Sequence, residues 1–330
     1  MPDFEIHNLE DGLTQIILSA PVGLEGILGA RTNVYLVEDS LPTLINAGHP
    51  TQNETLLRAL RACDTAPSDI ERIICTSWEI GILGGATQFP RADLFVLSPD
   101  MQAPRDLEMQ VDVARQHLLQ RAAEMAEVDQ NFRRQPVEDA MGRYYPRMTR
   151  NLGVIPLRNG HFVRAGPLKL EVLATAGPGP GHMALFGADD GYLFCGDFAM
   201  SGLPDRLDNA QGYLVSMDRL AELPAHRVLP NRGRSYTRGR LTVTRAARFI
   251  NNFLTNVPSV LVQGPTVLDF IERDRGHVIE NPVDLLLTFD VYHTLFEELV
   301  RTRTIAAEGE GMQRRYGVDV EDPRKRIRRI

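Results

Sequence analysis

Cysteine is scarce in this sequence of 330 residues, and long hydrophobic runs are missing. The three cysteines, Cys63, Cys75 and Cys195, stand in apolar surroundings and form no Cys-x-x-Cys pair, which favours buried reduced thiols and a cytoplasmic protein. No apolar segment reaches the roughly 20 residues needed to span a bilayer. Residues 1–20 lack the basic start and apolar run of a signal peptide. We therefore expect no membrane partner.

An excess of positive charge is also missing. Lys and Arg number 36 against 43 Asp and Glu, so the formal net charge is −7, which argues against a general polyanion binder. The hydrophobic content of 43% is sufficient for a sizeable core. The length allows two domains, or one large domain with an appendage.

One stretch has the pattern of a buried strand, a loop and a glycine pair. Residues 73–75 end the strand, and Gly84-Gly85 stands near the start of a helix. This frame resembles the metal-binding signature of the metallo-β-lactamase superfamily, in which Thr-His-x-His-x-Asp-His follows a strand and precedes a hydrophobic residue and Gly-Gly. The four ligand positions of that signature are occupied here by Ser77, Glu79, Gly81 and Ile82.

Four other parts of the chain match the same family in the right order, and the first of them is a pair of strands. Residues 33–37 and 44–48 resemble its "N-x-Y-L-V" and "L-I-D-x-G" strands, with Asn46 at the Asp position. Residues 174–185 resemble "H-T-P-G-H-x-P-G-H", with Pro178 at the ligand His and His182 at a second His that is usually not a ligand. The remaining two segments are the strand ending in Gly196-Asp197, which retains the bridging Asp197, and residues 228–233, in which Arg232 replaces the last His.

The resemblance covers residues 13–235 and implies an α+β fold, a four-layered αββα sandwich over residues 1–239. Residues 104–150 have helical spacing, and many members carry a helical insertion at this position that covers the mouth of the active site. A solvated helical hairpin or a dimer contact are the alternatives. Residues 240–307 resemble the C-terminal helical, winged-helix-like domain of some members. We expect the basic tail, residues 308–330, to be flexible or to dock on a neighbour.

A two-metal site needs several imidazoles and carboxylates that converge on zinc or iron. Of the seven positions that the family uses, only Asp197 keeps a matching ligand, although the carboxylate of Glu79 could also bind a divalent ion. We therefore predict a degenerate site with no metal and no other cofactor. A buried carboxylate without its cations needs compensation, and we expect Arg232 to form a fork with Asp197 and Glu79. Alternatively, Arg232 points to solvent.

Other chemistries have less support in the sequence. Ser77, His182 and Asp197 are the ingredients of a nucleophile, base and orienting acid, but no Gly-x-Ser-x-Gly elbow is present. A structural role for His182, bonded to backbone, is favoured over an acid–base role. Trp78, the single tryptophan, either plugs the pocket or lines a ligand site, and the other predicted pocket residues are Asn46, His182 and Arg232.

A basic cluster follows the last family segment. It could bind phosphate groups or nucleic acid, or could be a solvated face or an interface to acidic residues. Its members, apart from Arg232, are Arg234, Arg238, Arg240, Arg245 and Arg248.

The favoured function is a non-catalytic relative of these hydrolases that serves as a binding, scaffold or regulatory protein. We expect a homo-oligomer, such as a dimer, or another protein as partner, and a small-molecule or anionic ligand is possible. The first alternative is an active hydrolase of thioesters, lactones or phosphoesters with an atypical site built from Glu79, Asp197 and His182. The second is a nucleic-acid-binding module, which the acidic total charge disfavours.

Overall fold

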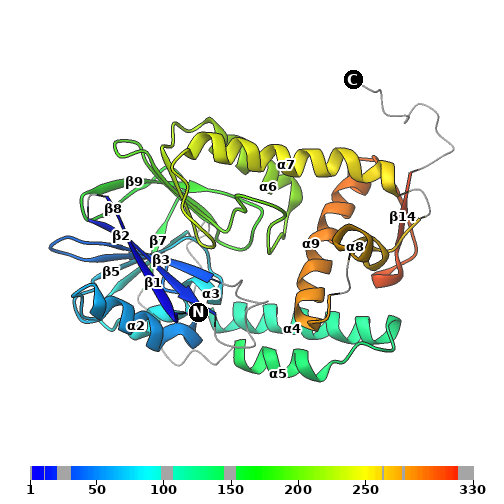
Figure 1. The fold of residues 1–330 in the computed structure, drawn as a ribbon, viewed down its shortest axis with the longest axis horizontal. Helices are drawn as coiled ribbons and strands as arrows, with labels where there is room; N and C mark the ends of the chain where they lie inside the picture. The colour runs from blue at the N-terminus through cyan, green and yellow to red at the C-terminus, as the bar shows by residue number, and fades with distance from the viewer. Residues whose placement is uncertain are drawn as a thin grey trace.

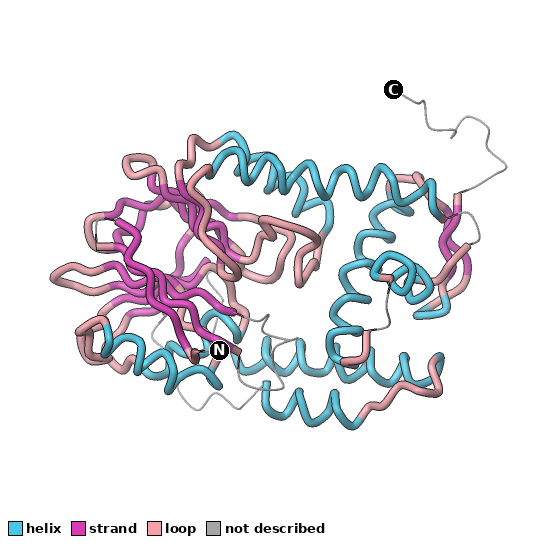
Figure 2. Tube along the Cα trace, viewed as in Figure 1, coloured by secondary structure: helices cyan, strands magenta, loops and turns pink. Residues whose placement is uncertain are grey.

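The computed structural model describes residues 2–10, 12–20, 31–97, 107–144, 154–261, 264–276 and 279–318. Two β-sheets lie on one side of the molecule and a group of helices lies on the other (Figures 1 and 2). None of the described helices combines the length and the apolar character needed to cross a bilayer.

The first sheet has seven strands in sequence order. Strands β1 to β4 pair in antiparallel fashion, whereas β4 to β7 pair in parallel. Because parallel strands point the same way, the loops that follow β4, β5 and β6 leave the same edge of the sheet. The strands are β1 (Phe4–Glu10), β2 (Leu13–Ser19), β3 (Arg31–Val37), β4 (Thr43–Ile45), β5 (Arg72–Cys75), β6 (Asp93–Leu97) and β7 (Val154–Leu157).

The second sheet has five strands in the order β12-β11-β10-β9-β8. Apolar side chains of the two sheets meet in a common core, in which the ring of Tyr35 packs edge-on against that of Phe194 with centroids 5.3 Å apart. The strands are β8 (Phe162–Ala165), β9 (Leu168–Ala174), β10 (Met183–Gly187), β11 (Tyr192–Gly196) and β12 (Arg227–Pro230).

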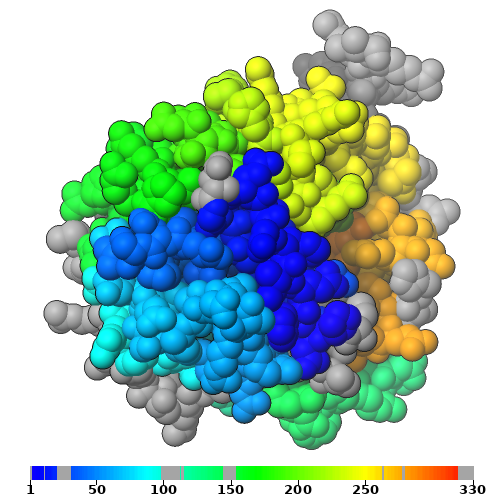
Figure 3. Space-filling view, turned by 60° about the vertical axis from the view of Figure 1, so that its left-hand side comes forward, coloured from blue at the N-terminus to red at the C-terminus, as the bar shows by residue number. Residues whose placement is uncertain are grey.

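Helices cover the outer face of each sheet. Helix α2 (Asn53–Ala62), the short α3 (Ile80–Leu83), and the 3₁₀ turns η1 (Pro50–Gln52) and η2 (Gly84–Gln88) lie against the first sheet. Helices α6 (Ala210–Glu222) and α7 (Gly239–Val260) lie against the second. This arrangement confirms the predicted four-layered αββα sandwich. The strand β1, which the sequence analysis did not predict, forms an edge of the first sheet, and its segment (dark blue) lies at the surface in Figure 3.

The remaining helices form a lobe with its own hydrophobic core. Helices α4 (Leu107–Val128) and α5 (Gln135–Tyr144) of the predicted insertion share this core with α8 (Val267–Arg275) and α9 (Pro282–Arg301). Met125, Val137 and Met141 are fully buried, and Arg121 Nε lies 3.0 Å from Asp290 Oδ1 on α9. The insertion is therefore not a solvated hairpin, because its apolar face is covered by the C-terminal helices.

The C-terminal segment contains regular structure that the sequence analysis did not predict. Strands β13 (Ala306–Glu308) and β14 (Arg315–Gly317) flank the turn η3 (Gly311–Gln313). Met312 and Tyr316 are buried in the core of the helical lobe. The prediction of a flexible tail from residue 308 is thus wrong for residues 308–318, because two large apolar side chains hold that segment. Residues 319–330 lie outside the described residues.

Candidate functional site

The candidate site lies where four loops from the two sheets converge. They are the loop after β5, the β9–β10 turn, the end of β11 and the end of β12, and contacts between them bring together Ser77, Asp197 and Asn231. The five segments that resemble the family pattern therefore assemble in space. The hydrogen bond from Asn33 to the carbonyl of Pro230, for example, joins residues that are 197 apart in the sequence.

Asp197 stands at the centre of this cluster. Its Oδ2 accepts a hydrogen bond from Ser77 Oγ at 3.3 Å, and its Oδ1 accepts one from Asn231 Nδ2 at 3.1 Å. Arg232 Nε lies 3.9 Å from the same Oδ1, which is an ion pair with a single contact and not the expected fork. Arg232 is 20% exposed and also contacts Asp205 at 3.4 Å, so it does not simply point to solvent. Burial raises the pKa of Asp197, while Arg232 and Asn231 act in the opposite direction.

Glu79 has a different arginine partner from the one predicted. Arg206, from the loop between β11 and α6, donates a hydrogen bond to Glu79 Oε1. The same guanidinium holds Asp208 through two bonds of 2.8 and 2.9 Å. The prediction that Arg232 would bind Glu79 as well as Asp197 is therefore corrected, since Arg206 takes that place. No sequence signal pointed to Arg206, because its loop matches no segment of the family pattern.

A buried network of amides connects the two sheets behind Asp197. Asn46 Nδ2 donates to Asn231 Oδ1 at 2.6 Å, and the backbone N–H of Thr76 donates to Asn46 Oδ1 at 3.0 Å. Asn46 has a φ of +66°, a left-handed conformation that asparagine tolerates better than most residues. Asn46 is fully buried, so this predicted pocket residue belongs to the wall and not to an open cavity. Asn231 was missed, although its place directly before Arg232 in a segment of the family pattern was a visible signal.

His182 uses both of its ring nitrogens inside the protein. Its Nε2 accepts the backbone N–H of Asp197 at 2.9 Å, and its Nδ1 lies 2.8 Å from Thr175 Oγ1. An Nε2 that accepts leaves the proton of the neutral ring on Nδ1, which can then donate to Thr175. Burial lowers the pKa of His182 to about 4. Its geometry is that of the structural histidine favoured by the sequence analysis, and Ser77 contacts Asp197 directly instead.

Trp78 fills the space between two of the converging loops. Its Nε1 donates to the carbonyl of Leu97 at 2.8 Å. The indole lies against Gly181 so closely that a Cβ on that glycine would be 2.2 Å from Trp78 Nε1. This packing favours the interpretation of Trp78 as a plug, because the indole is hydrogen-bonded to Leu97 and leaves no room for a side chain at residue 181.

The side chains at the former ligand positions do not fit a two-metal centre. Ile82 is part of the core beneath the first sheet, and Gly81, Ile82 and Pro178 are buried and carry no side-chain donor atom. The carboxylates of Glu79 and Asp197 each form an ion pair with an arginine. Within the described ranges, no group of three or more His, Cys, Asp and Glu side chains is arranged to hold a metal ion.

The glycines of the family frame have packing roles that do not depend on a metal. A Cβ on Gly85 would lie 2.0 Å from the carbonyl oxygen of Ala47. At Gly196, where φ is +64°, a Cβ would lie 2.3 Å from His182 Nε2. The frame of the signature is thus explained by close backbone approach.

The predicted basic cluster lies outside this site, except for Arg232. All five of its other members are exposed, and none forms an ion pair with a described residue. The guanidinium of Arg234 lies 5.1 Å from the ring centroid of Tyr236. The cluster therefore presents uncompensated positive charge beside the start of α7.

Comparison with known proteins agrees with this geometry. The family model described as the metallo-beta-lactamase superfamily matches residues 29–232. A metallo-beta-lactamase family protein from Thermus thermophilus is 19% identical, with a TM-score of 0.70, over 94% of this chain and 100% of that one. A beta-lactamase domain protein from Burkholderia ambifaria is 16% identical, with a TM-score of 0.71, over 95% and 93%.

A third solved structure, an archaeal metallo-beta-lactamase superfamily protein from Sulfolobus tokodaii, is 17% identical with a TM-score of 0.54, over 88% of this chain and 100% of that one. These likenesses extend over the helical lobe as well as the sandwich, but at such identities they show the fold alone. No curated protein matches the chain.

Proposed function

The chain belongs to the metallo-beta-lactamase superfamily, and from this membership we propose that it is a non-catalytic member that serves as a binding, scaffold or regulatory protein. Its partner in this proposal is a second copy of the chain or another protein. In this proposal, the site around Asp197, which binds metal in other members of the superfamily, is a hydrogen-bonded polar junction that connects the two sheets. Its residues are Asn46, Ser77, Glu79, His182, Asp197, Arg206, Asn231 and Arg232.

One observation carries the proposal: each carboxylate that remains at a ligand position, Glu79 and Asp197, is paired with an arginine. A guanidinium supplies the positive charge that a buried carboxylate needs, and it cannot activate a bound water as a metal ion does. A metal ion would have to displace Arg206 and Arg232 from Glu79 and Asp197.

The surrounding groups support the same interpretation. Both ring nitrogens of His182 are used, and the amides of Asn46 and Asn231 bond to each other. A satisfied network of this kind holds a structure in one arrangement and leaves few groups for a substrate.

The test is a metal and activity analysis of the full-length protein expressed with added zinc, iron and manganese. We expect well under one metal ion per chain by mass spectrometry, a melting temperature that a chelator does not change, and no hydrolysis of thioester, lactone or phosphoester probes above the buffer rate. Two ions per chain, together with hydrolysis that is lost on chelation and in Asp197→Ala, would overturn the proposal.

A metal-independent hydrolase is the second candidate, and the burial of Asp197 favours it, because burial raises the pKa of this carboxyl group and general acids are commonly carboxyl groups with a raised pKa. Hydrolysis that survives chelation and is lost in Asp197→Asn would select this candidate over a non-catalytic protein.

The nucleic-acid candidate depends on the exposed arginines near the start of α7. Binding to RNA or DNA that falls steeply with salt, and that is lost on replacing Arg238, Arg240 and Arg245 by Gln, would support it. Because the total charge is −7, we expect no such binding at physiological salt.

A further inference from the structure

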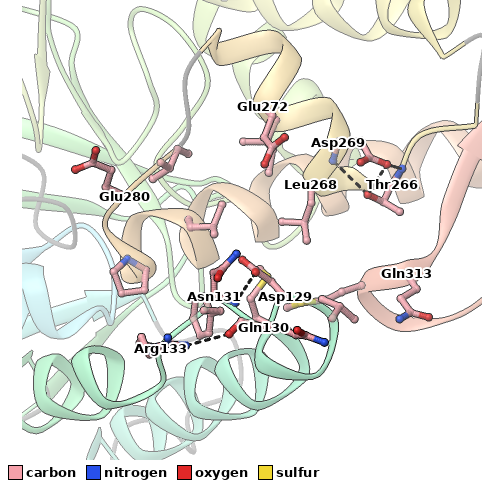
Figure 4. Close-up of a pocket in the computed structure, with 18 of the residues that line it drawn as sticks. Asp129, Gln130, Asn131, Arg133, Thr266, Leu268, Asp269, Glu272, Glu280 and Gln313 are labelled. Carbon is pink, nitrogen blue, oxygen red and sulfur yellow. Dashed lines mark hydrogen bonds between the residues drawn. The ribbon is translucent and has the colours of Figure 1, made fainter.

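A cavity of about 910 Å³ lies in the helical lobe, between the turn that joins α4 to α5 and the helices α8 and α9 (Figure 4). The cavity is separate from the site around Asp197, because neither Glu79, Asp197 nor their arginine partners line it. Its volume is within the range of cavities that hold small organic ligands. The turn η3 closes one end of the cavity through Met312 and Gln313.

The floor of the cavity is apolar. Three buried residues of the lobe's hydrophobic core also line the cavity. They are Met125, Ile271 and Met312. Leu268 and Leu285 are half-buried and extend the apolar surface toward the opening. The two methionines are flexible and polarisable, so such a floor can adapt to a hydrocarbon chain.

The charged groups at the cavity are mostly acidic. Four carboxylates and two guanidinium groups line it, and none of the six forms an ion pair with another described residue. These charged residues are Asp129, Asp269, Glu272, Glu280, Arg133 and Arg315.

Several of these charges already have hydrogen-bond partners within the protein. Arg133 donates to the carbonyl of Gln130 at 3.0 Å, and Arg315 donates to that of Gly264 at 3.1 Å. Asp269 caps α8 by accepting the N–H of Thr266 at 2.8 Å. In contrast, Glu272 and Glu280 are exposed and make no side-chain hydrogen bond with a described residue (Figure 4). The two carboxylates stand apart at the rim of the cavity, Glu272 on α8 and Glu280 just before α9 (Figure 4).

We propose that this cavity binds a small amphipathic cation, an amine with an apolar chain, whose ammonium group is attracted to the acidic rim that carries Glu272 and Glu280 while its chain covers the floor. The apolar chain gains by leaving water, and the carboxylates select the positive head group over a negative one. This site is independent of the function proposed for the polar junction.

The experiment measures binding of two probes of equal chain length, dodecylammonium and dodecanoate, to the full-length protein by calorimetry below their micelle concentrations. We expect saturable binding of one dodecylammonium per chain and at least fivefold weaker binding of dodecanoate. Glu272→Gln with Glu280→Gln should weaken dodecylammonium about fivefold. The matched control, Glu308→Gln with Glu310→Gln, changes two acidic residues outside the cavity and should leave the affinity unchanged.

A variant that fills the cavity provides a second measurement. Leu285→Trp adds an aromatic ring at the half-buried wall and should abolish binding of both probes. If this variant does not fold, the exposed glutamate pair still decides the matter. The proposal is overturned if dodecylammonium does not saturate, if dodecanoate binds as tightly, or if the Glu272 and Glu280 variant binds dodecylammonium as well as its control does.

Discussion

The Nε of Arg232 lies 3.9 Å from Oδ1 of Asp197, and both residues stand at positions that the family resemblance assigns to metal ligands. The positive charge beside this carboxylate is therefore part of the chain itself. Asp197 is only 12% exposed, so removing the arginine would leave a buried carboxylate with less compensation. The relationship can be measured by a double-mutant cycle.

We predict that Arg232→Met lowers the free energy of unfolding by about 1–2 kcal/mol at pH 7, because Asp197 then lacks its nearest cation. Asp197→Asn should cost less, since it removes the buried charge and keeps the size of the side chain. The double variant should lie closer to Asp197→Asn than to the sum of both changes. Urea unfolding of the four proteins gives the coupling, and additive effects would contradict this prediction.

The raised pKa of Asp197 also predicts how the free energy of unfolding changes with pH. Because the native state holds this proton more tightly than the unfolded chain, the contribution of Asp197 to stability falls as pH rises through the interval between its unfolded and native pKa values. Asp197→Asn should remove this part of the pH profile. A profile that is unchanged in Asp197→Asn would show that the carboxylate does not titrate as burial predicts.

The effect of His182 on stability should have the opposite pH dependence. Its pKa is lowered to about 4 from an ordinary value of 6.5, so the unfolded chain binds the proton more readily. Stability is then lost as pH falls from about 6.5 to about 4, by roughly 3 kcal/mol. His182→Gln can still accept the N–H of Asp197 and should reduce this loss. Nitrogen chemical shifts should report a neutral ring protonated on Nδ1 at pH 6, and a charged ring there would refute the argument.

Arg206 should hold the loop between β11 and α6 over the site. We predict that Arg206→Met increases hydrogen exchange of residues 199–209 about tenfold, because Glu79, which is 10% exposed, loses its partner. The fluorescence of Trp78, the next residue before Glu79, should shift as well. Arg238→Met removes an exposed arginine that forms no ion pair with a described residue and is the matched control. Equal exchange in both variants would show that Arg206 does not restrain the loop.

The glycine pair should be required for packing alone. Gly85→Ala places a Cβ against the carbonyl of Ala47 and should lower stability by about 3 kcal/mol. Gly142→Ala, in α5, meets no atom within 4 Å and should be neutral or stabilising by up to about 1 kcal/mol. Thermal unfolding of the two variants makes the comparison. A tolerated Gly85→Ala would show that the backbone there can move apart.

Much of the fold could be predicted because its signals are local. The apolar run at residues 33–37 is a pattern along a single strand, β3, and the helical spacing predicted for residues 104–150 is met by α4 and α5. The absence of imidazoles from the former ligand positions is likewise a matter of residue identity. It is readable without any coordinates, because Ile82 and Pro178 carry no donor atom wherever they lie.

The partners of the charged groups could not be predicted in this way. Arg206 and Glu79 are 127 residues apart, and the loop that carries Arg206 has neither periodicity nor a motif. The same holds for Met312 and Tyr316, whose burial depends on a core that the insertion and the C-terminal helices form together. Residue type and spacing report the environment along one element, whereas the meeting of two loops is decided by how whole sheets and helices pack, and that information exists only in three dimensions.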